Sequence, residues 1–315
     1  MQLSQPFLKL PIAFDGSALE AEVRALPSSS WVPHPTGYVG NEAVRLVTVG
    51  GQPTDAFEGP MRPTPQLEAC RYMREVMAEL GGVWGRSRLM GLGAGAEVPE
   101  HIDVHYHWRT HLRIHIPVIT NPAVEFTCGG ETVHMAPGEC WIFDSFRWHE
   151  VHNRGTEQRI HLVLDTVMTD SLWQLIDSAK SGTPSRSLTP GQRAPEPLYF
   201  ENYNAPTVMS AWEVRNHVAF IVPQMADDPR SAALTRRLER FADGWAGLWA
   251  RFGDSGDGLD DYRRMIAATR QDLVRLGAGE VEVENGLTLL PVVEQLVFVM
   301  AVAAPAQSAE QRLAS

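Results

Sequence analysis

The chain has little cysteine and no long apolar stretch. Its 315 residues include three cysteines, Cys70, Cys128 and Cys140, an odd number without any Cys-x-x-Cys spacing. This argues against a disulfide framework and a thiolate zinc site, and it fits a reducing compartment. No apolar run approaches the length of about 18 residues that a membrane helix needs. The first ten residues lack a basic region followed by an apolar core, so we expect an unsecreted, cytoplasmic protein without a membrane partner.

An excess of basic charge is also missing. The chain has 27 Lys and Arg residues against 38 Asp and Glu residues, a formal net charge of −11. Proteins that bind nucleic acid carry a basic patch, so we expect no nucleic-acid partner. Neither a Gly-x-Ser-x-Gly nucleophile elbow nor a P-loop occurs, which argues against those hydrolase and nucleotide-binding chemistries.

The residue pattern divides the chain into a strand-rich first part and a helical last part. Apolar residues at helical spacing over 66–80, followed by two glycines, predict a helix. Short apolar runs between 88 and 167, punctuated by Gly, Pro and Asn, predict an antiparallel sandwich or barrel. Ser, Thr, Pro and Gly then dominate a stretch typical of a linker. We therefore expect a first domain over 1–180, a linker over 181–205 and a helical region over 206–315.

Polar and apolar residues alternate between His101 and Pro117. Period-two alternation places the polar set on one face of an extended strand. The set is His101, Asp103, His105, His107, Arg109, His111, Arg113 and His115. A single strand of this length would exceed the usual limit of about 10 residues, so we expect a turn or bulge between Tyr106 and Thr110. Solvent-facing strands rarely carry mostly His and Arg, so this face is a candidate functional site, with Trp108 on the opposite, core-facing side.

Three residues of this region form a candidate metal site. His101 and Asp103 lie two residues apart on one strand face, close enough to share one ion, and His149 is the candidate third ligand. Two imidazoles and one carboxylate are the ligand set of non-haem Fe(II) oxygenases. Three nearby histidines remain alternative ligands: His105, His107 and His111. Many histidines near a metal only orient the ligands or pack beside them.

Arg159 is a candidate anchor for a co-substrate. The turn at Asn153-Arg154-Gly155 predicts a hairpin that brings Arg159 close to His149. The planar guanidinium of arginine binds carboxylates through two parallel hydrogen bonds. An arginine in this position would hold an oxidisable co-substrate such as 2-oxoglutarate. A cupin-like isomerase or sensor has no need of such an anchor.

Four motifs occur together between residues 98 and 165. They are Val98-Pro99-x-His101, Arg113-x-His115-x-Pro117, Gly138-x-x-Trp141-x-Phe143-Asp144-Ser145-x-x-x-His149-Glu150-Val151-x-Asn153 and Arg159-x-x-Leu162-x-Leu164-Asp165. Together they resemble the aspartyl/asparaginyl β-hydroxylase family of Fe(II)- and 2-oxoglutarate-dependent dioxygenases. The animal peptide hydroxylases of that family have Gly where this chain has Asp103. In its metal motif the chain is therefore more similar to the free-proline hydroxylase branch.

The resemblance implies a fold, a cofactor set and a reaction. The fold is mainly β, a double-stranded β-helix (a cupin-like jelly roll) with a flanking N-terminal helix and a C-terminal helical region. The cofactors are Fe(II), 2-oxoglutarate as co-substrate and O2. Iron is held by His101, Asp103 and His149, and 2-oxoglutarate by Arg159 and His115. The reaction hydroxylates an unactivated C–H bond of an amino acid or peptidyl residue, with succinate and CO2 as co-products.

Arg113 and His107 are the candidate substrate-binding residues. Arg113 lies on the site face with no acidic neighbour in its own strand, and an unpaired guanidinium in a pocket is costly. We therefore expect a small amino acid or peptide substrate that brings a carboxylate. The alternative is that Arg113 pairs with an acid of the helical region. The sequence leaves open whether the chain is a homodimer, and a second function, a cupin-like metal-binding protein with an isomerase or sensor role, remains as the alternative.

Overall fold

The computed structural model describes residues 3–303, which form two compact units. The first unit takes in the chain as far as Asp103 and then His107–Asn204. The second unit takes in Val104–Tyr106 and the chain from Ala205 onward. Each unit has its own hydrophobic core. The domain limits expected from the sequence remain a prediction.

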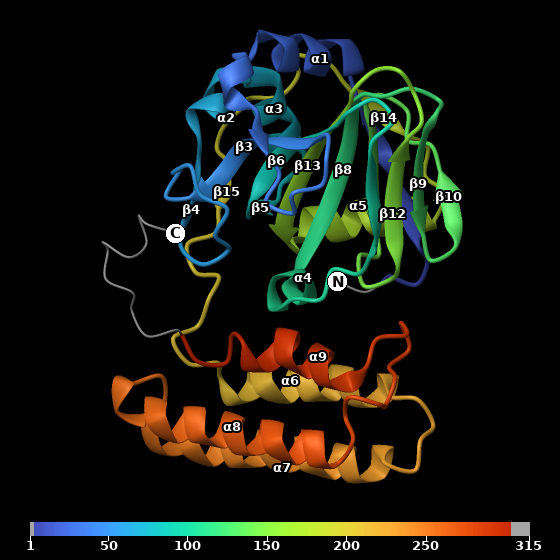
Figure 1. The fold of residues 1–315 in the computed structure, drawn as a ribbon. Coiled ribbons are helices and arrows are strands. Elements are labelled where there is room, and N and C mark those ends of the chain that lie inside the picture. Colours follow the sequence, from blue (N-terminus) through green and yellow to red (C-terminus); the bar gives the residue numbers. More distant parts are fainter. Residues whose placement is uncertain (1–2, 304–315) are drawn as a thin grey trace. The chain divides into compact units, whose positions relative to one another are not determined.

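Eight strands of the first unit form two facing antiparallel sheets (Figure 1). The larger sheet contains β6 (Ser87–Leu92), β8 (His111–Ile119), β11 (Glu139–Phe143) and β13 (Arg159–Val167), and the smaller contains β7 (Glu97–His101), β9 (Val124–Cys128), β10 (Glu131–Val133) and β12 (His149–Asn153). Their spatial orders are β11-β8-β13-β6 and β10-β9-β12-β7. The chain thus crosses repeatedly from one sheet to the other. This is the double-stranded β-helix predicted from the sequence, and the predicted fold class is confirmed.

Further strands extend the larger sheet on both sides. They are β1 (Phe7–Phe14), β2 (Val32–Pro33), β3 (Asn41–Val49), β4 (Met61–Pro63), β5 (Val83–Trp84), β14 (Arg186–Leu188) and β15 (Tyr199–Phe200). The last two lie inside the segment expected to be a bare linker, yet β14 pairs with β1 and β15 pairs with β5. Both pairings are parallel and join residues far apart in the sequence. The local amino-acid composition therefore did not predict these two pairings.

Four helices of the first unit cover the outer face of the larger sheet. They are α1 (Gly16–Ala25), α2 (Pro65–Ala69), α3 (Arg71–Leu80) and α5 (Asp170–Lys180). The helix predicted over 66–80 is broken at Cys70 into α2 and α3. The break is stabilised by Glu22 of α1, whose carboxylate accepts hydrogen bonds from the backbone N–H groups of Tyr72 (2.6 Å) and Met73 (2.9 Å). A side chain distant in sequence therefore caps α3.

The alternation along β8 and β13 decides which side chains reach the interior of the jelly roll. The apolar positions, among them Ile114 and Leu162, are fully buried in the cluster under the helices. The intervening positions, such as Arg113 and Asp165, face the cavity between the sheets. A strand presents successive side chains to opposite faces, so one sheet serves as core wall and site wall at once.

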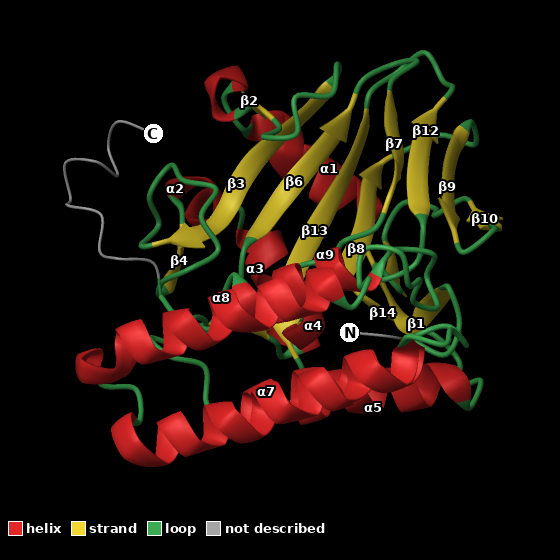
Figure 2. Ribbon diagram, turned by 60° about the horizontal axis from the view of Figure 1, so that its bottom comes forward, coloured by secondary structure: helices red, strands yellow, loops and turns green. Residues whose placement is uncertain are grey.

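The second unit is helical in its described part (Figure 2). Its helices are α6 (Ala211–Ile221), α7 (Ser231–Phe252), α8 (Leu259–Arg275) and α9 (Leu289–Val293), with a short π-helical turn at Glu294–Phe298. The fully buried rings of Phe241, Trp245 and Tyr262 form the centre of this core. Across residues 3–303, no helix has both the length and the apolar character needed to cross a bilayer.

Gly138 is the tightest turn position in the jelly roll. Its φ is +77°, and a Cβ atom there would come within 2.0 Å of the carbonyl oxygen of Phe14. We expect Gly138→Ala to lower the free energy of unfolding by at least about 2 kcal/mol, because both φ strain and a backbone clash oppose it. Gly130 is the matched control, since its φ is +81° with nothing within 4 Å. Urea denaturation of both variants measures the difference, and equal destabilisation would contradict a role for the clash.

Candidate active site

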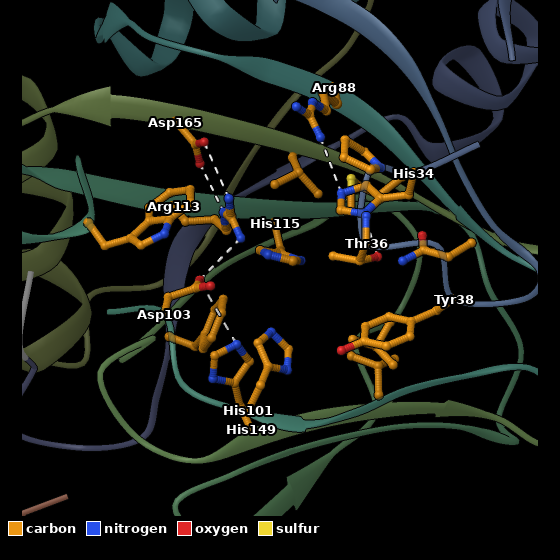
Figure 3. Close-up of a pocket in the computed structure, with 18 of the residues that line it drawn as sticks. His34, Thr36, Tyr38, Arg88, His101, Asp103, Arg113, His115, His149 and Asp165 are labelled. Atoms are coloured by element: carbon orange, nitrogen blue, oxygen red, sulfur yellow. Dashed lines mark hydrogen bonds and ion pairs between the residues drawn. The ribbon is translucent and has the colours of Figure 1, made fainter. Parts of the chain in front are cut away.

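A cavity of about 350 Å³ lies inside the first unit, with lining residues from both sheets of the jelly roll. The smaller sheet contributes His101 and His149, and the larger sheet contributes Arg113, His115 and Arg159. Figure 3 shows these imidazoles and the Arg113 guanidinium turned toward a shared space. The size is in the usual range for a site that binds a small molecule.

The structure brings the three predicted metal ligands together. One ligand atom from each of His101, Asp103 and His149 lies within 4.8 Å of the other two. His149 on β12 stands directly opposite His101 on β7, and their ring centroids are 4.2 Å apart. Asp103 follows the end of β7, where its backbone N–H donates to the carbonyl of Ser145 (3.0 Å). Backbone pairing therefore fixes the spacing of the donors.

The hydrogen bonds of the two imidazoles suit metal binding. Nδ1 of His101 lies 2.8 Å from the carbonyl oxygen of Pro99, and Nδ1 of His149 lies 2.8 Å from that of Arg147. A carbonyl only accepts, so each Nδ1 carries the proton and each Nε2 keeps its lone pair for a cation. Burial lowers the pKa of His149 to about 4, which keeps this imidazole neutral. The donor set therefore fits a divalent transition metal.

Arg159 and His115 form a second polar end of the cavity. Both side chains are buried, and burial lowers the pKa of Arg159 to about 9. One Arg159 nitrogen donates to Nδ1 of His161 at 2.7 Å, while Nε of Arg159 and Nε2 of His115 have no hydrogen-bond partner in the described chain. Buried polar groups are normally satisfied, and the free N–H at Nε of Arg159 is a donor that fits a bound carboxylate. This is the end of the cavity where the sequence predicted 2-oxoglutarate.

Arg113 does not have the environment that the sequence predicted. Its Nε donates to one oxygen of Asp165 (3.0 Å), and its Nη1 donates to Asp103 (3.3 Å). The expectation that Arg113 lacks an acidic partner is therefore wrong, and the acid comes from neither its own strand nor the helical region. Asp165 stands opposite Arg113 in the pairing of β13 with β8. Burial alone would raise the pKa of Asp165, but Arg113 holds it well below the usual range.

The segment between β7 and β8 also differs from expectation. A short helix, α4 (Tyr106–Thr110), replaces the predicted turn or bulge, so the alternating pattern does not continue through it. His107 consequently stacks on His111 with ring centroids 3.7 Å apart, and it is not among the residues that line the cavity. This corrects the expectation that His107 faces the substrate. His105 falls in the segment grouped with the second unit, and none of the three alternative histidines is in the metal-ligand cluster.

Two other expectations about the site are corrected by the sheet topology. β12 and β13 do not form a hairpin, because β12 pairs within the smaller sheet and β13 within the larger one. The turn at 153–155 thus carries the chain across the cavity. Trp108, expected to face only the core, lines the cavity, and the guanidinium of Arg113 lies 3.9 Å from its ring centroid.

One wall of the cavity was not predicted from the sequence. His34, Thr36 and Tyr38 line it from the segment before β3, and Figure 3 shows them across the space from Asp103. Arg86, which directly precedes β6, and Arg88 of β6 also line the cavity. The two arginines are two residues apart, a spacing that places side chains on one face of a strand. No local sequence pattern indicates that these arginines, or the residues before β3, lie near the metal-binding histidines.

The middle of the chain matches a known protein family. Residues 62–169 match the family described as Aspartyl/Asparaginyl beta-hydroxylase. The predicted family resemblance is confirmed. The matched stretch is about a third of the chain, and it includes all eight jelly-roll strands, the metal-ligand cluster and Arg159. His34, Thr36 and Tyr38 lie outside it.

Solved structures show only distant similarity. A 2OG-Fe(II) oxygenase family oxidoreductase from Burkholderia pseudomallei is 14% identical with a TM-score of 0.37, covering 48% of this chain and 77% of that chain. A prolyl-4-hydroxylase from Pseudomonas putida is 14% identical with a TM-score of 0.36, covering 53% and 95%. A predicted oxalate decarboxylase from Thermotoga maritima is 17% identical with a TM-score of 0.28, covering 46% and 99%. TM-scores this low establish neither fold nor function, and no curated protein matches the chain.

Asp165 provides a test of the buried ion pair. We expect Asp165→Asn to lower the free energy of unfolding by about 3 kcal/mol, because Arg113 then loses its main buried counter-charge. The depressed pKa of Asp165 adds a pH dependence: the wild-type advantage is full above about pH 4 and shrinks as pH falls further. Chemical denaturation from pH 3 to pH 7 measures both effects. Asp243→Asn, at an exposed ion pair with Arg215, is the control, and a pH-independent difference would contradict the assignment.

Proposed function

We propose that this protein is an Fe(II)- and 2-oxoglutarate-dependent dioxygenase that hydroxylates an unactivated C–H bond of an amino acid or peptidyl residue. The observation that carries this proposal is the cluster of His101, Asp103 and His149 in one cavity with Arg159. The match to a hydroxylase family over the same residues supports it. A cupin-like isomerase or sensor would leave the buried guanidinium of Arg159 without a role.

In this proposal each polar group of the cavity has one task. His101, Asp103 and His149 would hold iron, and Arg159 and His115 would bind the carboxylates of 2-oxoglutarate. When bound, iron with O2 and 2-oxoglutarate supplies the oxidising power for hydroxylation, with succinate and CO2 as co-products. The protein supplies the ligands, their orientation and a water-poor space. Phe126 and Phe143 contribute to that space, since both rings pack against His115 at centroid distances of 5.5 and 5.3 Å.

Arg113 has a positioning role in this proposal. Its hydrogen bond to one oxygen of Asp103 fixes the orientation of that carboxylate, while Asp165 fixes the guanidinium from the other side. Groups that orient a ligand carboxylate in this way normally contribute to metal affinity. Arg113 therefore acts on the metal site through Asp103.

Replacing each proposed ligand with Ala tests the metal site. We expect His101→Ala, Asp103→Ala and His149→Ala each to weaken Fe(II) binding by more than about tenfold, since loss of even an outer partner costs that much. Anaerobic Fe(II) titration gives the affinities. His152→Ala is the matched control, because His152 lies on the same strand but pairs with Glu97 and Glu150 at the surface. A ligand variant with wild-type affinity would remove that residue from the site.

Arg159→Leu tests the co-substrate site. We expect it to weaken 2-oxoglutarate binding by about 2 to 5 kcal/mol, the range for losing one partner of a buried charge pair, and to leave Fe(II) affinity nearly unchanged. Arg154→Leu, at an exposed ion pair in the adjacent turn, serves as the control. Calorimetric titration of 2-oxoglutarate into the Fe(II)-loaded protein without oxygen measures the change. Unchanged affinity in the Leu variant would exclude Arg159 as the anchor.

Turnover is tested by a substrate screen. Amino acids and short peptides are incubated with the protein, Fe(II), 2-oxoglutarate and O2, and succinate release is measured above the substrate-free rate. We expect at least one compound to stimulate release, and the stimulation to disappear in Asp103→Ala. A protein that binds Fe(II) but never forms succinate would favour the cupin-like alternative.

A further inference from the structure

Four arginines line the cavity in the described chain, and they fall into two classes. Arg113 pairs with Asp165 and Asp103, and Arg88 donates to Asp55 at 2.7 Å. Arg86 and Arg159, by contrast, form no ion pair within 4.0 Å among the described residues. The cavity therefore contains two guanidinium groups without a protein counter-charge, of which the proposed co-substrate accounts for one.

The sheet register places the backbones of Arg159 and Arg86 near opposite ends of β13. Arg159 begins β13 and stands opposite Leu92, the last residue of β6. At the other end, the N–H of Gly85, next to Arg86, donates to the carbonyl of Asp165 (2.7 Å). Six residues of extended chain from Arg159 to Asp165 span about 20 Å. A carboxylate of 2-oxoglutarate bound to Arg159 would therefore not also reach Arg86.

The surroundings of Arg86 leave most of its donors free. Its guanidinium lies 3.6 Å from the ring centroid of Phe57 and 5.9 Å from that of Trp108. One N–H donates to the backbone carbonyl of Asp55 (3.2 Å), out of the five N–H groups that an arginine carries. Burial and the neighbouring charge of Arg88 lower the pKa of Arg86 to about 9. The protein thus holds this cation in an unfavourable place, without a carboxylate partner among residues 3–303.

The charged residues near Arg86 carry more positive than negative charge. The carboxylates of Asp165 and Asp55 lie near Arg86, but Asp165 already accepts hydrogen bonds from Arg113, and Asp55 accepts them from Arg45 and Arg88. The guanidinium groups of Arg45, Arg86, Arg88 and Arg113 therefore surround these two carboxylates. A negatively charged ligand would correct the balance, and the planar carboxylate matches the fork of arginine.

We propose that Arg86 binds the carboxylate of a small substrate and so selects a free acid over its neutral derivative. This inference rests on the proposed function and names the substrate class for that site. Phe57 and Trp108 flank the carboxylate, while the remainder of the substrate extends toward His101 and His149. A cavity of about 350 Å³, which also has to hold the co-substrate, fits a molecule of amino-acid size. Arg86 thus takes the role that the sequence had assigned to Arg113.

Calorimetry with a defined panel tests this inference. The twenty common L-amino acids and their C-terminal amides are titrated into protein loaded with Fe(II) and 2-oxoglutarate without oxygen. In the wild type we expect at least one acid to bind tenfold or more tightly than its amide. In Arg86→Gln this ratio should fall to near one, and in Arg86→Lys, which keeps the charge but not the fork, it should be intermediate. Arg24→Gln, at an exposed pair with Glu20, should keep the wild-type ratio.

The outcomes separate this inference from the proposed function. Unchanged 2-oxoglutarate affinity and circular dichroism in Arg86→Gln show that the variant is folded and that its co-substrate end is intact. If no acid binds better than its amide, or if the preference persists in Arg86→Gln, the role of Arg86 is overturned while the dioxygenase proposal stands. If the wild type binds neither Fe(II) nor 2-oxoglutarate, the proposed function fails and this inference fails with it.

Discussion

The site depends on the ion pairs of Arg113, whose side chain is mostly buried. Its guanidinium joins Asp165, on the strand paired with its own, to Asp103, the carboxylate of the candidate metal cluster. A buried charge is tolerated only when it is paired and hydrogen-bonded, so these three side chains stabilise one another in one arrangement. The stacking of Arg113 over Trp108 restricts the guanidinium further. The position of Asp103 is thereby tied to the rigid larger sheet, although Asp103 itself lies beyond the end of β7.

The double-stranded β-helix explains how one small cavity holds so many polar groups. Each strand of the larger sheet sends alternate side chains toward the helices, where they form an apolar core, and the others toward the smaller sheet. The core supplies the stability that permits buried arginines and histidines on the opposite face. The long strand β13 contributes Arg159, Val163 and Asp165 to the cavity at successive depths. Strand β13 therefore sets the distance between Arg159 at one end of the cavity and Asp165 at the other.

The sequence predicted structure correctly where a motif or a regular spacing of apolar residues was present. The spacing of His101 and Asp103, with His149 as a third donor, predicted a cluster that the structure brings within 4.8 Å. The strand pattern over 88–167 predicted the jelly roll, and α7 and α8 lie in the region over 206–315 that was expected to be helical. The prediction was wrong at α4. The alternation of polar and apolar residues in the sequence continues through Tyr106–Thr110, although the backbone there is helical. The prediction was also wrong at the turn after β12, since a turn motif does not reveal which sheet the next strand joins.

The sequence by itself determined the chemistry available to this protein: two imidazoles and a carboxylate for a metal, an arginine for a carboxylate, and strands on which to present them. Tertiary structure alone decided which charges are already neutralised. Asp165 is 52 residues from Arg113 and Asp55 is 33 residues from Arg88, yet both pairs are in contact, while Arg86 has no such partner in the described chain. Ion pairing depends on distances across sheets, and strand register fixes those distances through backbone hydrogen bonds between distant segments.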